Sequence, residues 1–107
     1  MEQRVKKEIE FIKESVLMAV PAEKIYLFGS YAYGTPDENS DLDIYVVVPD
    51  IDIDLADTSA RIRKNMRHRR TIPMDLLIGK ESVFNRRKQG PTLEREIAQK
   101  GVVLYGA

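Results

Sequence analysis

The sequence predicts an α/β (α+β) fold, in which a small mixed β-sheet is backed by helices. Three features predict it: a helical apolar stripe at the start, a strand with alternating apolar residues at 41–48, and an order of elements that reads α-β-β-α-β-α-α-β. The chain has 107 residues, which is the size of one domain. Because it shows neither a repeat nor a linker, we expect residues 1–107 to form a single domain.

The first half of the chain predicts a helix and two strands. Residues 2–19 form the expected helix, because apolar residues recur there every three or four positions. These residues are Val5, Ile9, Ile12, Val16 and Val20. The apolar run 25–28 predicts a short strand, and 31–40 predicts a loop with room for one helical turn at its start. Residues 41–48 alternate between the two faces of the second strand.

The second half predicts three helices and two more strands. In chain order they occupy residues 53–68, 72–78, 81–88, 90–101 and 102–105. Acidic residues in the first turn of the first of these helices and basic residues in its last turn suit the helix dipole. Because proline suits the first helical position, we place the start of the last helix at Gly90-Pro91 and its end at Gly101.

Composition excludes several classes of function. The chain has no cysteine, so disulfides, thiolate metal sites and cysteine nucleophiles are ruled out. The 17 Lys and Arg residues balance the 17 Asp and Glu residues, so net charge implies no membrane partner and no required nucleic acid. No apolar run approaches the roughly 18 residues that span a bilayer, and the first twenty residues show no signal-peptide pattern. We therefore expect a cytoplasmic protein.

Carboxylates interrupt two of the predicted strands. Asp41 and Asp43 leave the same face of strand 41–48, about 6.6 Å apart at the backbone. Asp75 interrupts the third strand in the same way, so the three carboxylates converge if these strands are neighbours. Carboxylates that converge repel one another unless a cation lies between them. Oxygen-only ligands favour Mg²⁺ or Mn²⁺, and two such ions about 3.5–4 Å apart would clamp both reacting oxygens of a phosphoryl displacement.

A Gly29-Ser30 step directly follows the first predicted strand. Backbone N–H groups and a hydroxyl at such a turn can hold a phosphate, and Gly29 lets the backbone approach it closely. Each signal is weak alone, because Gly-Ser is often only a turn and an Asp-x-Asp strand can be a solvent-facing edge. Together they are more specific.

The combined spacing resembles a known signature. Gly29-Ser30, ten residues, Asp41-Leu42-Asp43 and a later aspartate resemble the nucleotidyltransferase motif of the polymerase β superfamily. The segments 28–34 (Phe-Gly-Ser-Tyr-Ala-Tyr-Gly) and 39–44 (Asn-Ser-Asp-Leu-Asp-Ile) resemble the minimal nucleotidyltransferases (MNT proteins), and the resemblance covers nearly the whole chain.

The resemblance implies a metal-dependent nucleotidyltransferase that transfers a nucleoside monophosphate, usually AMP from ATP, to a hydroxyl and releases pyrophosphate. It implies that Asp41 and Asp43 hold two Mg²⁺ or Mn²⁺ ions and that Asp75 completes one of them and is the candidate base. Gly29 and Ser30 would grip the β- and γ-phosphates. Many MNT proteins resemble antitoxins, so the resemblance also implies a HEPN-type toxin as partner, with a tyrosine as the acceptor.

One position departs from the family pattern. Many relatives read Gly-Ser-x-Ala-Arg-Gly, whereas Tyr33 stands at the arginine here, which leaves charge neutralisation to the metals, to Lys80 or to the basic block Arg61–Arg70. Tyr31, Tyr33 and Lys80 are candidate contacts for the nucleotide or the partner. The lost arginine favours a non-catalytic binding antitoxin, and the three carboxylates favour the enzyme. A third alternative is transfer to a small-molecule hydroxyl, for which the chain has no additional domain.

Overall fold

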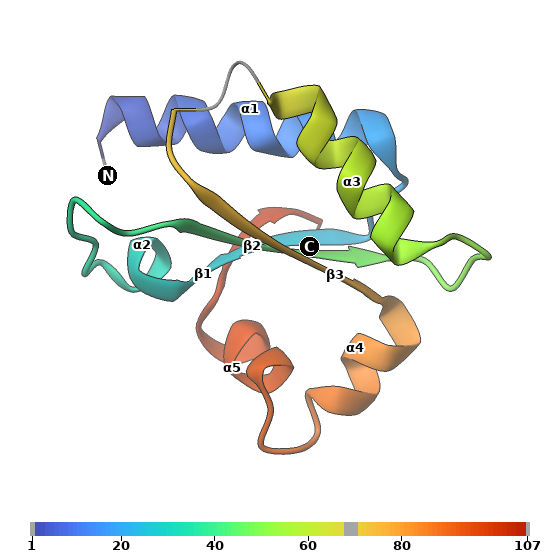
Figure 1. Cartoon of the computed structure of the whole chain (residues 1–107). Helices are drawn as coiled ribbons and strands as arrows, with labels where there is room; N and C mark the ends of the chain where they lie inside the picture. Colours follow the sequence, from blue (N-terminus) through green and yellow to red (C-terminus); the bar gives the residue numbers. More distant parts are fainter. Residues whose placement is uncertain (1, 68–70, 107) are drawn as a thin grey trace.

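The computed structural model describes residues 2–67 and 71–106, which form one four-stranded sheet with helices on both faces (Figure 1). In chain order the elements are α1 (Gln3–Ala19), β1 (Lys24–Phe28), α2 (Gly29–Tyr33), β2 (Leu42–Val48), α3 (Leu55–Met66), β3 (Met74–Lys80), α4 (Glu81–Arg87), α5 (Leu93–Lys100) and β4 (Val102–Tyr105). The predicted α/β (α+β) class and the order of the main elements are confirmed. The helical turn allowed at the start of the 31–40 loop is α2, which begins two residues earlier.

The sheet has the strand order β3-β2-β1-β4. β2 runs parallel to β3 and antiparallel to β1, and β1 is antiparallel to β4. The strands that carry Asp43 and Asp75 are therefore neighbours, which is the arrangement that convergence of their carboxylates requires.

Helices α1 and α3 cover one face of the sheet, and α4 and α5 cover the other (Figure 1). The α1/α3 face holds the larger apolar core, because Leu42, Ile44, Val46 and Val48 of β2 all point into it and are fully buried. One charged side chain borders this core: Glu8 of α1 accepts hydrogen bonds from the backbone N–H groups of Thr71 and Ile72. These bonds tie α1 to the segment that leads into β3.

The α4/α5 face holds a smaller and more aromatic cluster. Its buried members are Tyr26, Phe28, Tyr45, Val47, Phe84 and Ile97. Phe84 of α4 is central, with its ring centroid 5.6 Å from that of Tyr26 and 5.3 Å from that of Tyr45. This face is therefore also packed. Asp43, the next residue of β2 on this face after Tyr45, is not part of the cluster.

Some element boundaries differ from the prediction. The last helix does not start at Gly90-Pro91: Thr92 is its N-cap, because the Thr92 hydroxyl accepts a hydrogen bond from the Arg95 N–H, and the helix begins at Leu93. Likewise, Asp54 caps α3, which begins two residues later than predicted, and β3 lies two residues later than expected. Residues 68–70, at the end of the predicted helix 53–68 and of the basic block, lie outside the described residues.

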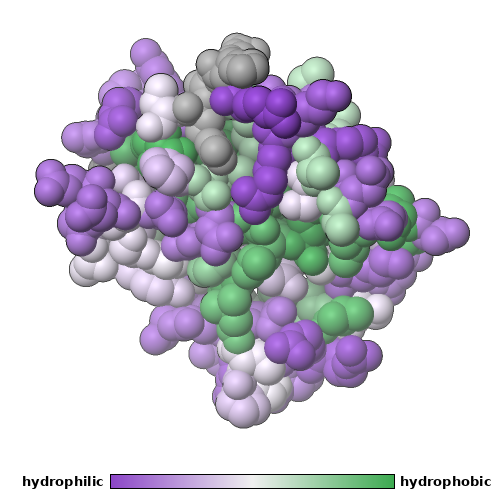
Figure 2. All heavy atoms as spheres, in the orientation of Figure 1, coloured by the Kyte–Doolittle hydropathy of each residue, from purple (hydrophilic) through white to green (hydrophobic). Residues whose placement is uncertain are grey.

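The outer surface is mostly polar in the view of Figure 2. Hydrophilic side chains of the helices surround a band of apolar atoms in the middle of this face, where the edge strand β3 runs (Figure 2). Among the described helices, none combines the length and the hydropathy needed to cross a membrane.

Candidate active site

Three strands bring the candidate residues to one end of the sheet. In the register of the sheet, Asp43 of β2 lies between Phe28 of β1 and Asp75 of β3. Asp43 and Asp75 are direct neighbours across two parallel strands, so their backbones lie about 4.8 Å apart. The sequence predicted this pair, and the register confirms that the two residues meet on one face.

Asp41 lies just before the start of β2 and is exposed. The Asp41 carboxylate nevertheless interacts electrostatically with that of Asp43, because it contributes to the raised pKa of Asp43. Burial raises the pKa of the Asp43 carboxyl, and the negative charges of Asp75 and Asp41 raise it further. Like charges disfavour ionisation only when they are close, so the three carboxylates share one electrostatic environment.

Gly29 allows the turn after β1 to reach these carboxylates. Its φ is +74°, a conformation that glycine adopts without strain. A Cβ on Gly29 would overlap the carboxylate of Asp43. The backbone of the Gly29-Ser30 turn thus lies directly against Asp43, and a larger residue at position 29 would be strained and would displace the Asp43 carboxylate.

Tyr33 lies one helical turn after Gly29, on the same side as the carboxylates. Burial raises the pKa of its hydroxyl, and the charges of Glu96 and Asp43 raise it too, while a hydrogen bond from the Gly29 backbone N–H acts in the opposite direction. The hydroxyl therefore sits beside Gly29, close to Asp43 and to Glu96 of α5. The sequence singled out Tyr33 but not Glu96, which looks like any exposed polar residue of an amphipathic helix.

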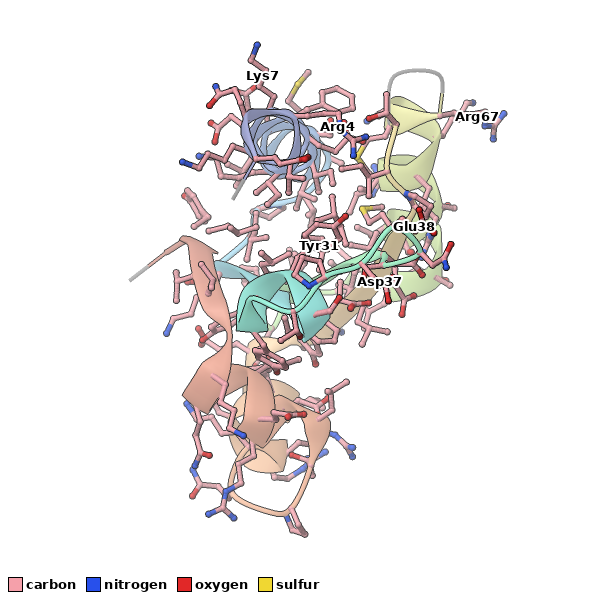
Figure 3. All side chains as sticks on the ribbon, turned by 90° about the vertical axis from the view of Figure 1, so that its left-hand side faces the viewer. Arg4, Lys7, Tyr31, Asp37, Glu38 and Arg67 are labelled. Atoms are coloured by element: carbon pink, nitrogen blue, oxygen red, sulfur yellow. The ribbon has the colours of Figure 1, made fainter. Side chains whose placement is uncertain are left out.

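Tyr31 occupies a different place. It packs against the core on the α1 side and lines a cavity of about 440 Å³ between the start of α1 and the 36–38 loop. Figure 3 shows Tyr31 there, below Arg4 and beside Asp37 and Glu38. None of the three candidate carboxylates lines this cavity, so Tyr31 is not gathered with them.

Lys80 is not brought to the site. It pairs in register with Val48 at the far end of β2, five residues along β3 from Asp75, or about 17 Å. The described part of the basic block is also separate, because it lies on α3 over the opposite face. There, Arg61 pairs with Asp57, and Arg63 donates to the Leu76 carbonyl oxygen.

The donor set fits a divalent cation in type. Asp41, Asp43 and Asp75 offer only carboxylate oxygens, the ligands that Mg²⁺ and Mn²⁺ prefer. As the side chains stand, no three Asp, Glu or His residues within 2–67 and 71–106 surround a common point. Asp43 and Asp75 start from adjacent backbone positions, and Asp41 lies two residues before Asp43, so the three residues lie at the same end of the sheet.

A buried polar network lies on the face of β2 that carries Asp43, and the sequence analysis did not predict it. The Tyr45 hydroxyl donates to Glu94 Oε2 at 3.1 Å, and Arg87 Nε donates to Glu94 Oε1 at 3.0 Å. Burial acts to raise the pKa of Glu94, but hydrogen bonds from its own N–H, Arg87 and Tyr45 more than offset this and lower it. The only sequence signal was a tyrosine two residues after Asp43, because the partners lie 42 and 49 positions further along the chain.

Fold and site together define a class of protein. The chain belongs to the nucleotidyltransferase domain family, whose match covers residues 5–104. The predicted membership is confirmed, and the chain is a nucleotidyltransferase by family.

The chain is similar to one named protein and to several solved structures. A protein of Methanocaldococcus jannaschii named "putative protein adenylyltransferase" is 33% identical over 84 residues, which is 78% of each chain. A solved toxin–antitoxin structure with AMP-PNP aligns with a TM-score of 0.62 at 23% identity, over 92% of this chain and 73% of that one. The structure of a "putative nucleotidyltransferase" from Sulfolobus solfataricus aligns with a TM-score of 0.60 at 19% identity, over 99% of this chain and 89% of that one.

A further solved structure, of a mutant of the toxin–antitoxin MntA–HpeT, aligns with a TM-score of 0.59 at 19% identity, over 92% of this chain and 73% of that one. At these identities the three solved structures establish the shared fold.

Proposed function

We propose that this protein transfers AMP from ATP to a hydroxyl of a partner protein, with metal ions bound at Asp41, Asp43 and Asp75 and with release of pyrophosphate. The observation that carries the proposal is the in-register pair Asp43–Asp75, set directly against the Gly29-Ser30 turn. A group of like-charged carboxylates next to a backbone turn is costly for a fold, and it becomes useful when cations and a nucleotide bind there.

Each residue has a distinct role in this proposal. Asp41 and Asp43 hold the metals, which when bound neutralise charge on the attacking and leaving oxygens. Gly29 and Ser30 bind the β- and γ-phosphates through backbone N–H groups and the serine hydroxyl. Asp75 is the base: it accepts the acceptor's proton as the acceptor oxygen bonds to the α-phosphorus and the α–β bridging bond breaks.

The relatives support the nucleotide and the acceptor class. One structural neighbour was solved with AMP-PNP, and the Methanocaldococcus jannaschii relative is named for adenylyl transfer to protein. The MntA–HpeT mutant replaces two aspartates, two positions apart, by glutamates, the same spacing as Asp41 and Asp43. Because neighbours are toxin–antitoxin complexes, we propose a toxin of the HEPN type as partner, with a tyrosine hydroxyl as the acceptor.

The test follows the labelled phosphate. With ATP labelled at the α-phosphate, label should appear on the partner, whereas γ-label should leave as pyrophosphate. Asp41→Asn and Asp43→Asn should each reduce transfer by about 10³-fold or more, because electrostatic stabilisation is usually the largest catalytic contribution. Ser30→Ala should cost less, because the backbone N–H groups remain. Asp52→Asn, a matched loss of one exposed carboxylate outside the site, should leave transfer unchanged.

Two other outcomes would identify the alternatives. If the wild-type chain and an Asp41→Asn/Asp43→Asn variant neutralise the partner equally well and no α-label moves, the protein is a binding antitoxin with a transferase fold. If α-label moves to a small-molecule hydroxyl but never to the partner protein, the acceptor assignment is wrong while the transferase chemistry stands.

A further inference from the structure

The proposed site has a surplus of negative charge. Asp41, Asp43 and Asp75 lie together, and the nearby side chain of Tyr33 is neutral. A bound triphosphate adds several more negative charges. Lys80 and the described basic residues of α3 lie elsewhere in the fold, so a cation from another element has to be sought.

Helix α5 ends at this site. Gly101, the residue after α5, packs against β1, and a Cβ on it would lie 3.3 Å from the Leu27 carbonyl oxygen. Leu27 comes two residues before Gly29, so the C-terminal end of α5 lies next to the Gly29-Ser30 turn. Figures 1 and 3 both show the junction of α5 and β4 beside α2.

The orientation of α5 places one basic residue toward that turn. Ile97 is fully buried against the sheet, and helical geometry puts Lys100 about 60° around the helix from it. Glu96, which lies near the Tyr33 hydroxyl, is only about 40° from Lys100 on the same side and one turn earlier. Lys100 therefore lies on the side of α5 that carries Glu96, between Ile97 and Glu96 around the helix.

Lys100 is also uncommitted. It is exposed, and among the ion pairs of residues 2–67 and 71–106 none includes it. Two other basic residues on this face are engaged: Arg87 forms an ion pair with Glu94, and the Lys88 amine lies 5.9 Å from the centre of the Phe84 ring. The four-carbon stem of a lysine is flexible, so the helix does not fix the position of the Lys100 amine.

We propose that Lys100 binds the terminal phosphates of the nucleoside triphosphate, as the side-chain cation of a site that is otherwise acidic. This inference deepens the proposed function and rests on it. It also assigns Glu96 a role of opposite sign, because the Glu96 carboxylate lies on the same side of α5 and opposes the binding of a polyphosphate.

The test compares ligands that share some groups and lack others. Equilibrium binding of ATP, inorganic tripolyphosphate and AMP is measured with Mg²⁺ for the wild type, Lys100→Gln, Lys100→Arg, Glu96→Gln and the control Lys7→Gln. Lys7 is exposed on α1 and points away from the molecule (Figure 3), so its change matches the charge loss outside the site. Lys100→Gln should weaken ATP and tripolyphosphate about tenfold or more and leave AMP within about twofold, because AMP has no terminal phosphates. Lys100→Arg should bind nearly as the wild type does, and Glu96→Gln more tightly.

Several results would overturn the inference. An unchanged affinity of Lys100→Gln for ATP, an equal loss for AMP, or an equal loss in Lys7→Gln would show that Lys100 makes no specific contact with the terminal phosphates. If the wild type transfers α-label normally and Lys100→Gln binds ATP as well as it does, only this inference fails. If the wild type binds neither ATP nor tripolyphosphate, the proposed function fails with it.

Discussion

The two faces of strand β2 present different kinds of side chain. Toward α1 and α3, the strand presents four aliphatic residues that are fully buried in the main core. Toward α4 and α5, the same strand presents Asp43, Tyr45 and Val47, of which only the last is a plain apolar residue. Successive residues of a strand alternate between faces, so one strand can stabilise the fold on one face and present the proposed site on the other. The comparison predicts that substitutions one residue apart will have opposite consequences.

The largest expected effect is on the α1/α3 face. Ile44→Ala should lower the free energy of unfolding by about 3 kcal/mol, because it removes buried methyl groups and leaves a cavity that the core fills only in part. Urea titration followed by circular dichroism measures this loss. ATP affinity of the folded variant should stay within a few-fold of wild type, and a large loss of affinity would show that the two faces are not separable.

The next effect falls on the buried network of the α4/α5 face. Glu94→Gln should destabilise the protein by about 2 kcal/mol near neutral pH, because the hydrogen bond from Arg87 to a charged acceptor is lost. Since the folded state lowers the pKa of Glu94, the stabilisation is complete above the unfolded value of about 4.3 and disappears as pH falls through the lower folded value. The urea midpoints of wild type and variant should therefore converge in acid. Curves that stay parallel down to the lowest pH would contradict this account.

A glycine pair sharpens the boundary between packing and chemistry. Gly29 and Gly34 both have positive φ, but only Gly29 has a side chain, that of Asp43, where a Cβ would go. Gly34→Ala should cost about 1 kcal/mol from backbone strain alone, and Gly29→Ala about 2 kcal/mol, with a further loss of nucleotide affinity. Thermal unfolding and ATP titration of the two variants separate these contributions. Equal behaviour would mean that the close approach to Asp43 has no role.

The smallest effect on stability, with the largest expected loss of activity, is at Asp43. In chelator, Asp43→Asn should be as stable as wild type or slightly more so, because burial and two neighbouring carboxylates raise the pKa of Asp43 in the folded state. Its ionised form therefore destabilises the fold at neutral pH, and this penalty vanishes as pH falls below the unfolded value. Mg²⁺ should raise the melting temperature of the wild type but not of the variant. A variant that is clearly less stable in chelator would show that the carboxylate is structural.

Much of the fold was readable because its signals are local. The stripe from Val5 to Val20 and the alternation in 41–48 depend only on spacing, and both elements appear within one residue of their predicted bounds. The start of α5 was misplaced because two rules competed: proline suits the first helical turn, but the Thr92 hydroxyl provides a side-chain cap one residue later. A cap that forms a hydrogen bond decided the boundary.

The sequence by itself determined the chemical content of the site: an Asp-x-Asp strand, a third aspartate and a Gly-Ser turn at recognisable spacing. Only the tertiary structure decided which other residues belong with them. Strand register set Asp75 beside Asp43 and placed Lys80 at the far end of the sheet, while chain reversal after α4 brought the end of α5 back against β1. The physical reason is range: periodicity and turn chemistry act over a few residues, whereas charges meet through packing between segments that are distant in the chain.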